Sequence, residues 1–192
     1  MREKEQRYVE TAIAVITRYG VRRTTMADIA REAGISRQTL YASFANKDEI
    51  VAASIRRLGE IVLERLQQTW REGGSLDEHV EAFFRYAVIE MYDQLQAMPD
   101  SDDLVNGYSD AARAATEEGS DRLRAVLAER LREHDTAFRQ QDVSTEAVAD
   151  LLLSSAHAFK YKARDRTHLL SLLRTLKIVV LHLAGQHSCG KV

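Results

Sequence analysis

Apolar residues recur every three or four positions along nearly the whole chain, in segments that glycines separate. This spacing places them on one face of an α-helix, whereas a half-buried strand would alternate apolar and polar residues. The chain holds a single proline, Pro99, so few positions forbid a helix. No convincing strand pattern and no internal repeat interrupts the series. The sequence therefore predicts an all-α fold.

Start and stop signals divide this pattern into helices. Ser36 is a good N-cap residue, and three further starts have the spacing of a capping box: Thr25 with Asp28, Asn46 with Glu49, and Ser75 with Glu78. Gly20, Gly73-Gly74 and Pro99 mark helix ends. The expected helices cover about 3–19, 25–33, 36–43, 46–71, 75–98, 120–140, 145–162 and 167–183, with one or two weaker helices within 100–119.

Charge is distributed unevenly along the 192 residues. Residues 1–50 carry nine Lys and Arg against seven Asp and Glu, residues 51–150 carry 11 against 21, and residues 151–192 carry seven against one. A mildly basic N-terminal segment followed by an acidic segment is typical of a protein that contacts nucleic acid with one end only. Chance scatter of surface charge explains the same numbers equally well, so charge alone leaves both interpretations open.

The chain shows no sign of secretion or membrane insertion. No apolar run is long enough to cross a bilayer, and the first ten residues, "MREKEQRYVE", lack the apolar stretch of a signal peptide. The single cysteine, Cys189, cannot form an internal disulfide. We expect a cytoplasmic protein without a membrane partner.

The last expected helix, 167–183, is apolar on nearly every side. Such a helix needs cover all round, and the last helix of a short chain is hard to cover with its own chain alone. Leu153, which lies off the main apolar face of helix 145–162, also favours cover by a partner chain. We expect these two helices to form a homodimer interface, with the central helix of a monomeric bundle as the alternative.

Two short helical patterns flank the turn "AGIS", Ala33 to Ser36, which indicates a helix-turn-helix. Ile29, Ile35 and Leu40 are the expected apolar anchors. The outward side of the second helix then carries Arg37, Gln38, Thr39 and Ser43, and no acid. Arg can bond guanine, Gln can pair with adenine and Thr can contact several base edges in a major groove.

The stretch "TTMADIAREAGISRQTLYASFANKDEIV" resembles the DNA-binding domain of the TetR (tetracycline repressor) family of bacterial transcription regulators. The resemblance covers about a quarter of the chain. The agreeing positions are Thr25, Ile29, Ala30, Ala33, Gly34, Ile35, Ser36, Leu40, Tyr41, Phe44, Asn46, Lys47, Asp48 and Ile50.

The resemblance implies a role for each matching residue. Tyr41, Lys47 and Thr25 correspond to positions that contact backbone phosphates, and Phe44 corresponds to a buried aromatic that holds the second short helix. Arg37, Gln38 and Thr39 occupy the variable base-reading positions. Ser43 departs from the His or Tyr usual in the family, so its contact is shorter, mediated by water or missing. The expected DNA-contact set is Thr25, Ser36, Arg37, Gln38, Thr39, Tyr41, Ser43 and Lys47.

For the whole chain, the resemblance implies a nine-helix TetR-like architecture. Residues 1–47 would form a three-helix DNA-binding domain, and residues 48–192 a helical ligand-binding and dimerisation domain. The implied function is a homodimeric transcriptional regulator, a repressor that a small-molecule effector releases from a palindromic operator in double-stranded DNA. The alternative is a helical small-molecule binder or adaptor that does not use DNA.

The family resemblance also places an effector pocket among the middle helices. Candidate contacts on apolar faces are Trp70, Phe84, Met91, Gln94, Tyr108, His134 and Phe138. Aromatic residues and Met at helical spacing are more often core residues, so each has a structural alternative. Neither a compact zinc spacing nor a glycine-rich phosphate loop is found, and Cys189 lies in a tail. We therefore expect no enzyme activity, no metal and no cofactor.

Overall fold

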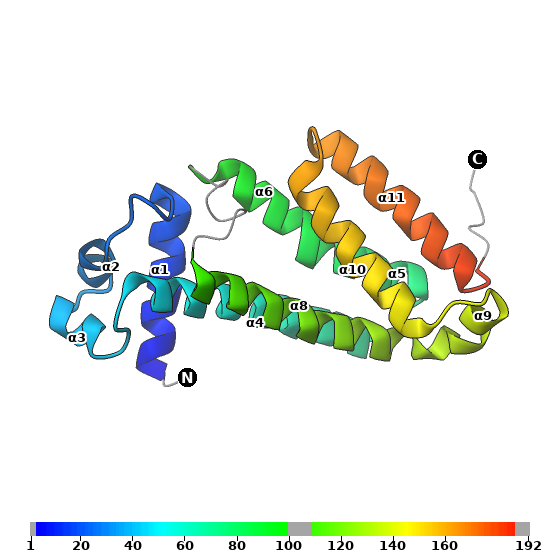
Figure 1. Ribbon diagram of the computed structural model, residues 1–192, viewed down its shortest axis with the longest axis horizontal. Coiled ribbons are helices and arrows are strands. Elements are labelled where there is room, and N and C mark those ends of the chain that lie inside the picture. Colours follow the sequence, from blue (N-terminus) through cyan, green and yellow to red (C-terminus); the bar gives the residue numbers. More distant parts are fainter. Residues whose placement is uncertain (1–2, 100–108, 187–192) are drawn as a thin grey trace. The chain divides into compact units, whose positions relative to one another are not determined.

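The structure, a computed structural model, describes residues 3–99 and 109–186, and Figure 1 shows its helices. All regular secondary structure within these two ranges is helical, which confirms the all-α prediction. The helical segments in these ranges form eight continuous runs rather than nine. Their bounds are α1 Glu3–Tyr19, α2 Met26–Glu32, α3 Arg37–Tyr41, α4 Lys47–Arg71, α5 Leu76–Phe83, the π-helical η1 Phe84–Ile89, α6 Glu90–Ala97, α8 Asp110–Leu131, the 3-10 helix η2 Arg132–His134, α9 Asp135–Gln140, α10 Thr145–Lys162 and α11 Arg166–Leu183.

Capping boxes define where α2 and α5 begin. The Thr25 hydroxyl accepts a hydrogen bond from the amide of Asp28, whose carboxylate accepts one from the amide of Thr25. Ser75 and Glu78 make the same reciprocal pair before α5. Both pairs satisfy amides that have no partner inside the helix. The sequence-based starts of these two helices are therefore confirmed.

The chain folds into two compact units. Unit 1 comprises Met1–Ile61 and Asp93–Gly119, and unit 2 comprises Val62–Tyr92 and Ser120–Val192. The predicted division after residue 47 falls at the start of α4, a helix whose residues belong to both units. The assignment of DNA binding and ligand binding to either side of residue 47 stays a prediction.

The core of unit 1 joins α1 to the two short helices that follow it. Val9 of α1, Ile29 of α2, Leu40 of α3 and Ile50 of α4 all have 0% exposed surface in one apolar cluster. Ile35, an expected anchor, is only partly buried at the edge of this cluster. Helices as short as α2 and α3 are marginal in isolation, so this shared burial is what stabilises them.

The core of unit 2 is built from α5, η1, α10 and α11, and side chains of α4, α6, α8 and α9 complete it. α10 and α11 pack on each other, α11 also packs on α5, and α10 packs on η1. Among its fully buried side chains are Phe83, Phe138, Leu152 and Leu169. Lys177 ties α11 to α5 at the surface, because its Nζ lies 2.8 Å from a carboxylate oxygen of Asp77 and 2.6 Å from one of Glu81.

The run from Leu76 to Ala97 contains a π-helical segment. The sequence predicted one helix over 75–98, and the span is confirmed, but η1 interrupts its α-helical geometry. A π turn holds one more residue than an α turn, which shifts the buried face by one position. The neighbouring Phe83 and Phe84 are accordingly both buried, with ring centroids 5.6 Å apart.

Gly119 does not end a helix, so the expected start at Ser120 is wrong. α8 runs through it from Asp110 to Leu131. Glycine inside a helix costs about 1 kcal/mol relative to alanine. Burial on both sides of Gly119 outweighs that cost, since Ala112 lies in the core of unit 1 and Leu127 in the core of unit 2. The expected helix to residue 140 is instead divided by η2.

The apolar surface of α10 and α11 differs from the predicted one. Leu153 is only 8% exposed and belongs to the core of unit 2, so the inference from that residue is wrong. The exposed large apolar side chains of the two helices are Leu151, Leu170, Ile178 and Val179. Over the described residues, every helix falls short of the length or apolar character needed to cross a membrane.

Candidate nucleic-acid interface

Gly34 sets the turn between α2 and α3. Its φ of +66° lies in the left-handed region, which costs a residue with a side chain about 1–2 kcal/mol. The Gly34 amide donates to the carbonyl of Arg31 at 3.2 Å, and the Ile35 amide donates to that of Ala30 at 3.0 Å. A Cβ at Gly34 would meet nothing within 4 Å. The requirement for glycine is therefore conformational, not steric.

The short helix α3 presents an exposed polar face. Ser36 caps it, because its Oγ accepts from the Thr39 amide at 3.0 Å. The two hydroxyls of this pair are also hydrogen-bonded, at 2.8 Å. Arg37 and Gln38 are exposed, and α3 contains no acidic residue. Either hydroxyl can be the donor in this contact, so the Thr39 hydroxyl proton is available to another acceptor when Ser36 donates.

Tyr41 is the most exposed aromatic side chain of unit 1 among the described residues, with 50% of its surface accessible. Its neighbours in the sequence point elsewhere, since Leu40 is fully buried and Phe44 is 8% exposed. Ser43 is half-buried, and its amide donates to the carbonyl of Leu40 at 3.0 Å. The burial of Leu40 and Phe44 thus fixes α3 so that Tyr41 faces solvent.

The first turn of α4 contacts the segment that precedes α2. Lys47 Nζ donates to the carbonyl of Arg22 at 3.3 Å. Asn46 caps α4, since its Oδ1 accepts from the Glu49 amide at 2.9 Å. The Glu49 carboxylate reaches back to the amide of Ala45, at 2.7 Å, rather than to that of Asn46 as a strict capping box requires. Lys47 is therefore held beside the α1–α2 connection.

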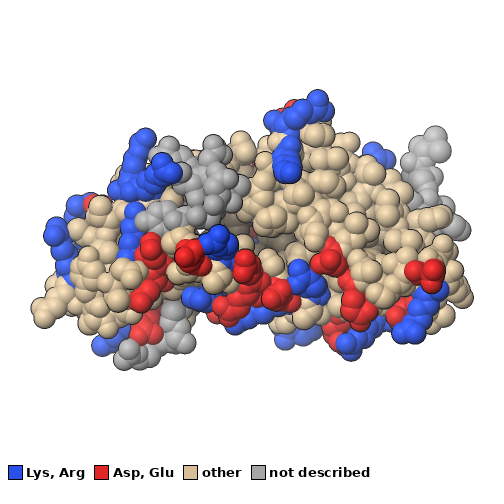
Figure 2. All heavy atoms as spheres, in the orientation of Figure 1, with Lys and Arg blue, Asp and Glu red and all other residues tan. Residues whose placement is uncertain are grey.

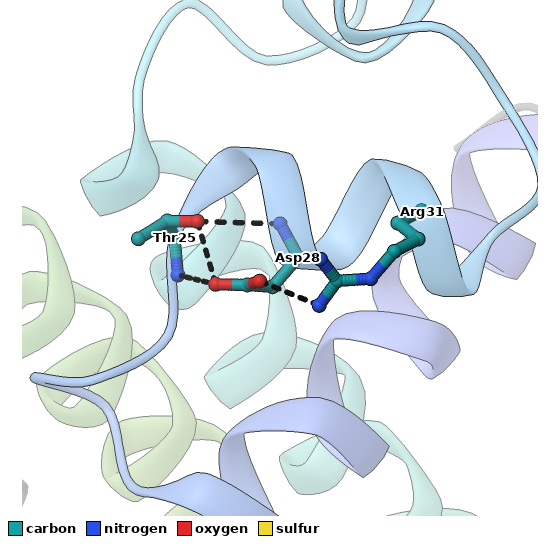
Figure 3. A network of polar contacts seen from close by, with 3 residues as sticks. All are labelled: Thr25, Asp28 and Arg31. Carbon is teal, nitrogen blue, oxygen red and sulfur yellow. Dashed lines mark hydrogen bonds and ion pairs between the residues drawn. The ribbon is translucent and has the colours of Figure 1, made fainter.

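Figure 3 shows Thr25, Asp28 and Arg31 in one polar network. Asp28 Oδ2 accepts from the Thr25 hydroxyl at 2.6 Å and from the Thr25 amide at 3.0 Å, and Asp28 Oδ1 accepts from Arg31 at 2.7 Å. The hydrogen bonds from Thr25, with a smaller contribution from Arg31, lower the pKa of the Asp28 carboxyl. Thr25 must exchange its bond to this carboxylate before its hydroxyl can donate to a phosphate.

The predicted DNA-contact residues all lie in unit 1, on or beside α2, α3 and the start of α4. The exposed members are Thr25, Ser36, Arg37, Gln38, Thr39 and Tyr41, and the half-buried members are Ser43 and Lys47. The roles of these residues stay predictions. The sequence-based set left out Arg22 and Arg23, two consecutive arginines that only Thr24 separates from the Thr25 cap.

Figure 2 shows the charge on one face of the molecule. Basic side chains gather at the outer end of the region of α1 and α2, acidic side chains also lie over the region of α1, and both kinds are mixed along α8. Glu3 and Glu10 of α1 and Glu32 of α2 are exposed, so the basic character of this region is confined to part of its surface.

Residues 9–54, which include α2, the Gly34 turn and α3, match the family described as "Bacterial regulatory proteins, tetR family". This segment of the chain is therefore a tetR-family domain. Two curated relatives from Pseudomonas putida, the HTH-type transcriptional regulator TtgR and the probable HTH-type transcriptional regulator ArpR, are each 41% identical over 58 residues. That segment covers 30% of this chain but only 28% of each relative.

Solved structures extend the likeness in fold over nearly the whole chain. A transcriptional regulator from Rhodococcus sp. Rha1 has a TM-score of 0.71 at 18% identity, covering 93% of this chain and 96% of that one. GusR of Salmonella enterica has a TM-score of 0.67 at 21% identity, covering 95% of each chain. The fatty acid degradation regulator FadR of Bacillus halodurans has a TM-score of 0.66 at 16% identity, covering 94% of this chain and 96% of that one. At such identities, these likenesses establish a shared fold.

The predicted effector contacts fall into different surroundings. Trp70, Phe84 and Phe138 are buried in the core of unit 2. Met91 and His134 are half-buried residues of unit 2, Gln94 is exposed in unit 1, and Tyr108 lies outside the described residues. Phe138 has no exposed surface, so it could contact a ligand only after a rearrangement. The structure thus brings three of these residues into one core, and the pocket assignment stays a prediction.

A buried polar group in unit 2 escaped the sequence analysis. His79 is 4% exposed, and its Nδ1 accepts from Arg130 Nε at 3.0 Å while its Nε2 lies 3.3 Å from the carbonyl oxygen of Gly73. The backbone carbonyl of His79 also accepts from Trp70 Nε1 at 3.2 Å. Burial, and then the charge of Arg130, lower the pKa of His79. Arg130 Nη2 also lies 3.2 Å from Nε2, and the guanidinium beside both ring nitrogens favours a neutral imidazole.

Proposed function

We propose that this tetR-family chain is a homodimeric, sequence-specific transcriptional regulator, a repressor that a small-molecule effector releases from a palindromic operator. The observation that supports this most directly is the exposed, acid-free face of α3. Arg37, Gln38 and Thr39 on that face are side chains that hydrogen-bond to base edges in a major groove. The buried side of the same helix, anchored by Leu40, keeps these residues in a fixed orientation.

Three further residues would seat this face on the DNA backbone. Tyr41 is half exposed beside α3, Lys47 lies at the start of α4, and Thr25 caps α2. A hydroxyl or an ammonium group in such a position bonds phosphate oxygens without reading sequence. We assign Tyr41, Lys47 and Thr25 to this seating role.

A dimer would place two such helices on one operator. Half-sites about 34–36 Å apart then match the two-fold symmetry of the protein. The exposed apolar side chains of α10 and α11, among them Ile178 at 47% and Val179 at 42% exposure, are the surface that we assign to the interface. A two-fold axis would bring this surface against its own copy.

An effector would act by favouring one of two conformations of the dimer. Helix α4 is the element that we assign to transmission, because it contributes Ile50 to the core of unit 1 and Trp70 to the core of unit 2. A ligand that repacks Trp70 or Phe84 would therefore displace a helix that also anchors the DNA-binding unit.

DNA binding is tested by fluorescence anisotropy with fragments upstream of the gene, at several salt concentrations. Arg37→Ala should weaken binding by about 1–3 kcal/mol and relax sequence preference, whereas Lys47→Gln should weaken binding to all sequences and reduce the salt slope by about 1. Arg132→Gln, at an exposed position of unit 2, serves as the matched control. If binding to every upstream fragment is absent or insensitive to salt, the alternative of a helical binder or adaptor without DNA is favoured.

The dimer is tested by sedimentation velocity. Ile178→Asp places a charge in the proposed interface and should yield a monomer, while Gln68→Asp adds the same charge at an exposed position of α4 and should not. A wild-type protein that sediments as a monomer at micromolar concentration would overturn the dimer without affecting the proposed role of α3.

A further inference from the structure

Three arginines line a depression in unit 1 whose volume is about 370 Å³. Pockets for small ligands commonly range from about 300 to 1,000 Å³. The other described lining residues are Tyr19, Thr24, Asp28 and Pro99. All of them belong to unit 1, and none belongs to the predicted DNA-contact set. The depression is therefore distinct from the proposed base-reading face.

The three guanidinium groups come from three segments. Arg18 lies in the last turn of α1, Arg23 in the connection that follows, and Arg31 on α2. Among the residues that the structure describes, Asp28 is the only acidic one that lines the depression. The pKa of Arg18 is raised by Tyr19 and, to a smaller extent, by the Glu32 carboxylate outside this lining. Among the described lining residues, positive charge exceeds negative charge by three to one.

The Asp28 carboxylate in this depression already accepts hydrogen bonds from neighbouring residues. Asp28 uses one oxygen for the hydroxyl and amide of Thr25 and the other for Arg31. The Arg31 side chain is 76% exposed, and an exposed ion pair of this kind contributes about 0–1 kcal/mol. Arg31 can therefore exchange the carboxylate for a stronger acceptor at little cost.

Guanidinium groups bind phosphate oxygens through paired, charge-assisted hydrogen bonds. We propose that this depression, lined by Arg18, Arg23 and Arg31, is a binding site for a phosphate group. The phosphate has two possible sources: the DNA backbone that flanks the operator, or a free phosphorylated small molecule. Tyr19, with 48% of its surface exposed, offers a flat ring against which the organic part of such a molecule can pack.

The network in Figure 3 connects Arg31 of this site with Thr25, which is a proposed contact with the DNA backbone. A phosphate that takes Arg31 from Asp28 leaves the Asp28 carboxylate held by Thr25 alone. Because Thr25 is a proposed backbone contact, occupancy of the depression changes the charge next to that contact. This coupling rests on the proposed DNA-binding function, whereas phosphate binding itself does not.

The test compares the full-length Arg18→Gln/Arg31→Gln variant with the matched control Lys4→Gln/Arg56→Gln, which removes two charges from unit 1 outside the depression. Isothermal titration calorimetry at low salt measures binding of inorganic pyrophosphate without DNA. Fluorescence anisotropy measures DNA affinity and its salt slope. Circular dichroism melting verifies that both variants are folded, and Arg18→Gln alone, which leaves the Asp28–Arg31 pair intact, must change binding in the same direction.

A free phosphorylated ligand is the source if the depression variant binds pyrophosphate at least tenfold more weakly than the wild type while its DNA affinity stays within twofold. The DNA backbone is the source if its DNA affinity falls about tenfold and the salt slope falls by about 1. The proposal is overturned if neither property of the depression variant differs from that of the control. If the wild-type protein binds no DNA, the proposed function fails, and the pyrophosphate measurement still decides this inference.

Discussion

Replacing Gly34 with alanine tests whether the turn of the helix-turn-helix needs a left-handed residue. The φ of +66° at Gly34 is unfavourable for alanine by about 1–2 kcal/mol. No steric cost is added, because a Cβ there meets nothing within 4 Å. Alanine also lowers the entropy of the unfolded chain, which returns about 0.4–1 kcal/mol of stability. The net expectation is a loss of about 1 kcal/mol.

Gly59 is the matched control within the same unit. It lies inside α4, and a Cβ at this position also meets nothing within 4 Å. Its backbone is helical, so Gly59→Ala should stabilise the protein by about 0.5–1 kcal/mol. The two variants make the same chemical change in equally open space. Their free energies of unfolding should therefore differ by about 1.5–2 kcal/mol, with opposite signs relative to the wild type.

Urea denaturation followed by far-ultraviolet circular dichroism measures this difference, at one protein concentration because association would shift the apparent stability. Gly34→Asn should be less destabilising than Gly34→Ala, since asparagine tolerates the left-handed region better. The reasoning is refuted if Gly34→Ala stabilises the protein as much as Gly59→Ala does.

Three further predictions concern buried and capping residues. Leu40→Ala should lower the free energy of unfolding by about 2–5 kcal/mol in urea melts, because Leu40 has no exposed surface; a loss below 1 kcal/mol would contradict its place in the core. Ser75→Ala should cost about 1 kcal/mol by the same assay through the lost cap of α5, and Ser75→Thr should cost less. The lowered pKa of His79 means that its contribution to stability is complete above about pH 6.5 and is lost as the pH falls through the lowered folded-state pKa. In urea melts between pH 7 and 5, the free energy of unfolding of His79→Gln should therefore depend less on pH than that of the wild type. Equal pH dependence of the two proteins would contradict the contribution assigned to His79.

The parts of the fold that sequence predicted well depend on interactions within a few residues. The caps at Thr25, Ser36 and Ser75 bond amides three residues away, and the turn at Gly34 depends on its own backbone angle. The apolar spacing in α1 likewise reports on a single face of one helix. Each signal is complete inside a short window, so the sequence alone was sufficient.

The predictions that were wrong all depend on contacts between residues far apart in the sequence. Gly119 has the local character of a helix end, yet α8 continues through it because its two halves are packed in different cores. Leu153 and Leu151 lie two residues apart on α10, and only packing makes the first 8% and the second 41% exposed. Periodicity records that a residue is apolar, not which neighbour covers it.

The sequence by itself determined that this chain is helical, where most helices begin, and that its N-terminal part is a tetR-family domain, because local hydrogen bonds and a dense motif define those properties. The tertiary structure alone decided which residues meet across the chain. It paired His79 with Arg130, 51 residues apart, and gathered Arg18, Arg31 and Pro99 around one depression. These contacts follow from how the helices pack, because close packing brings side chains together regardless of their separation in the sequence.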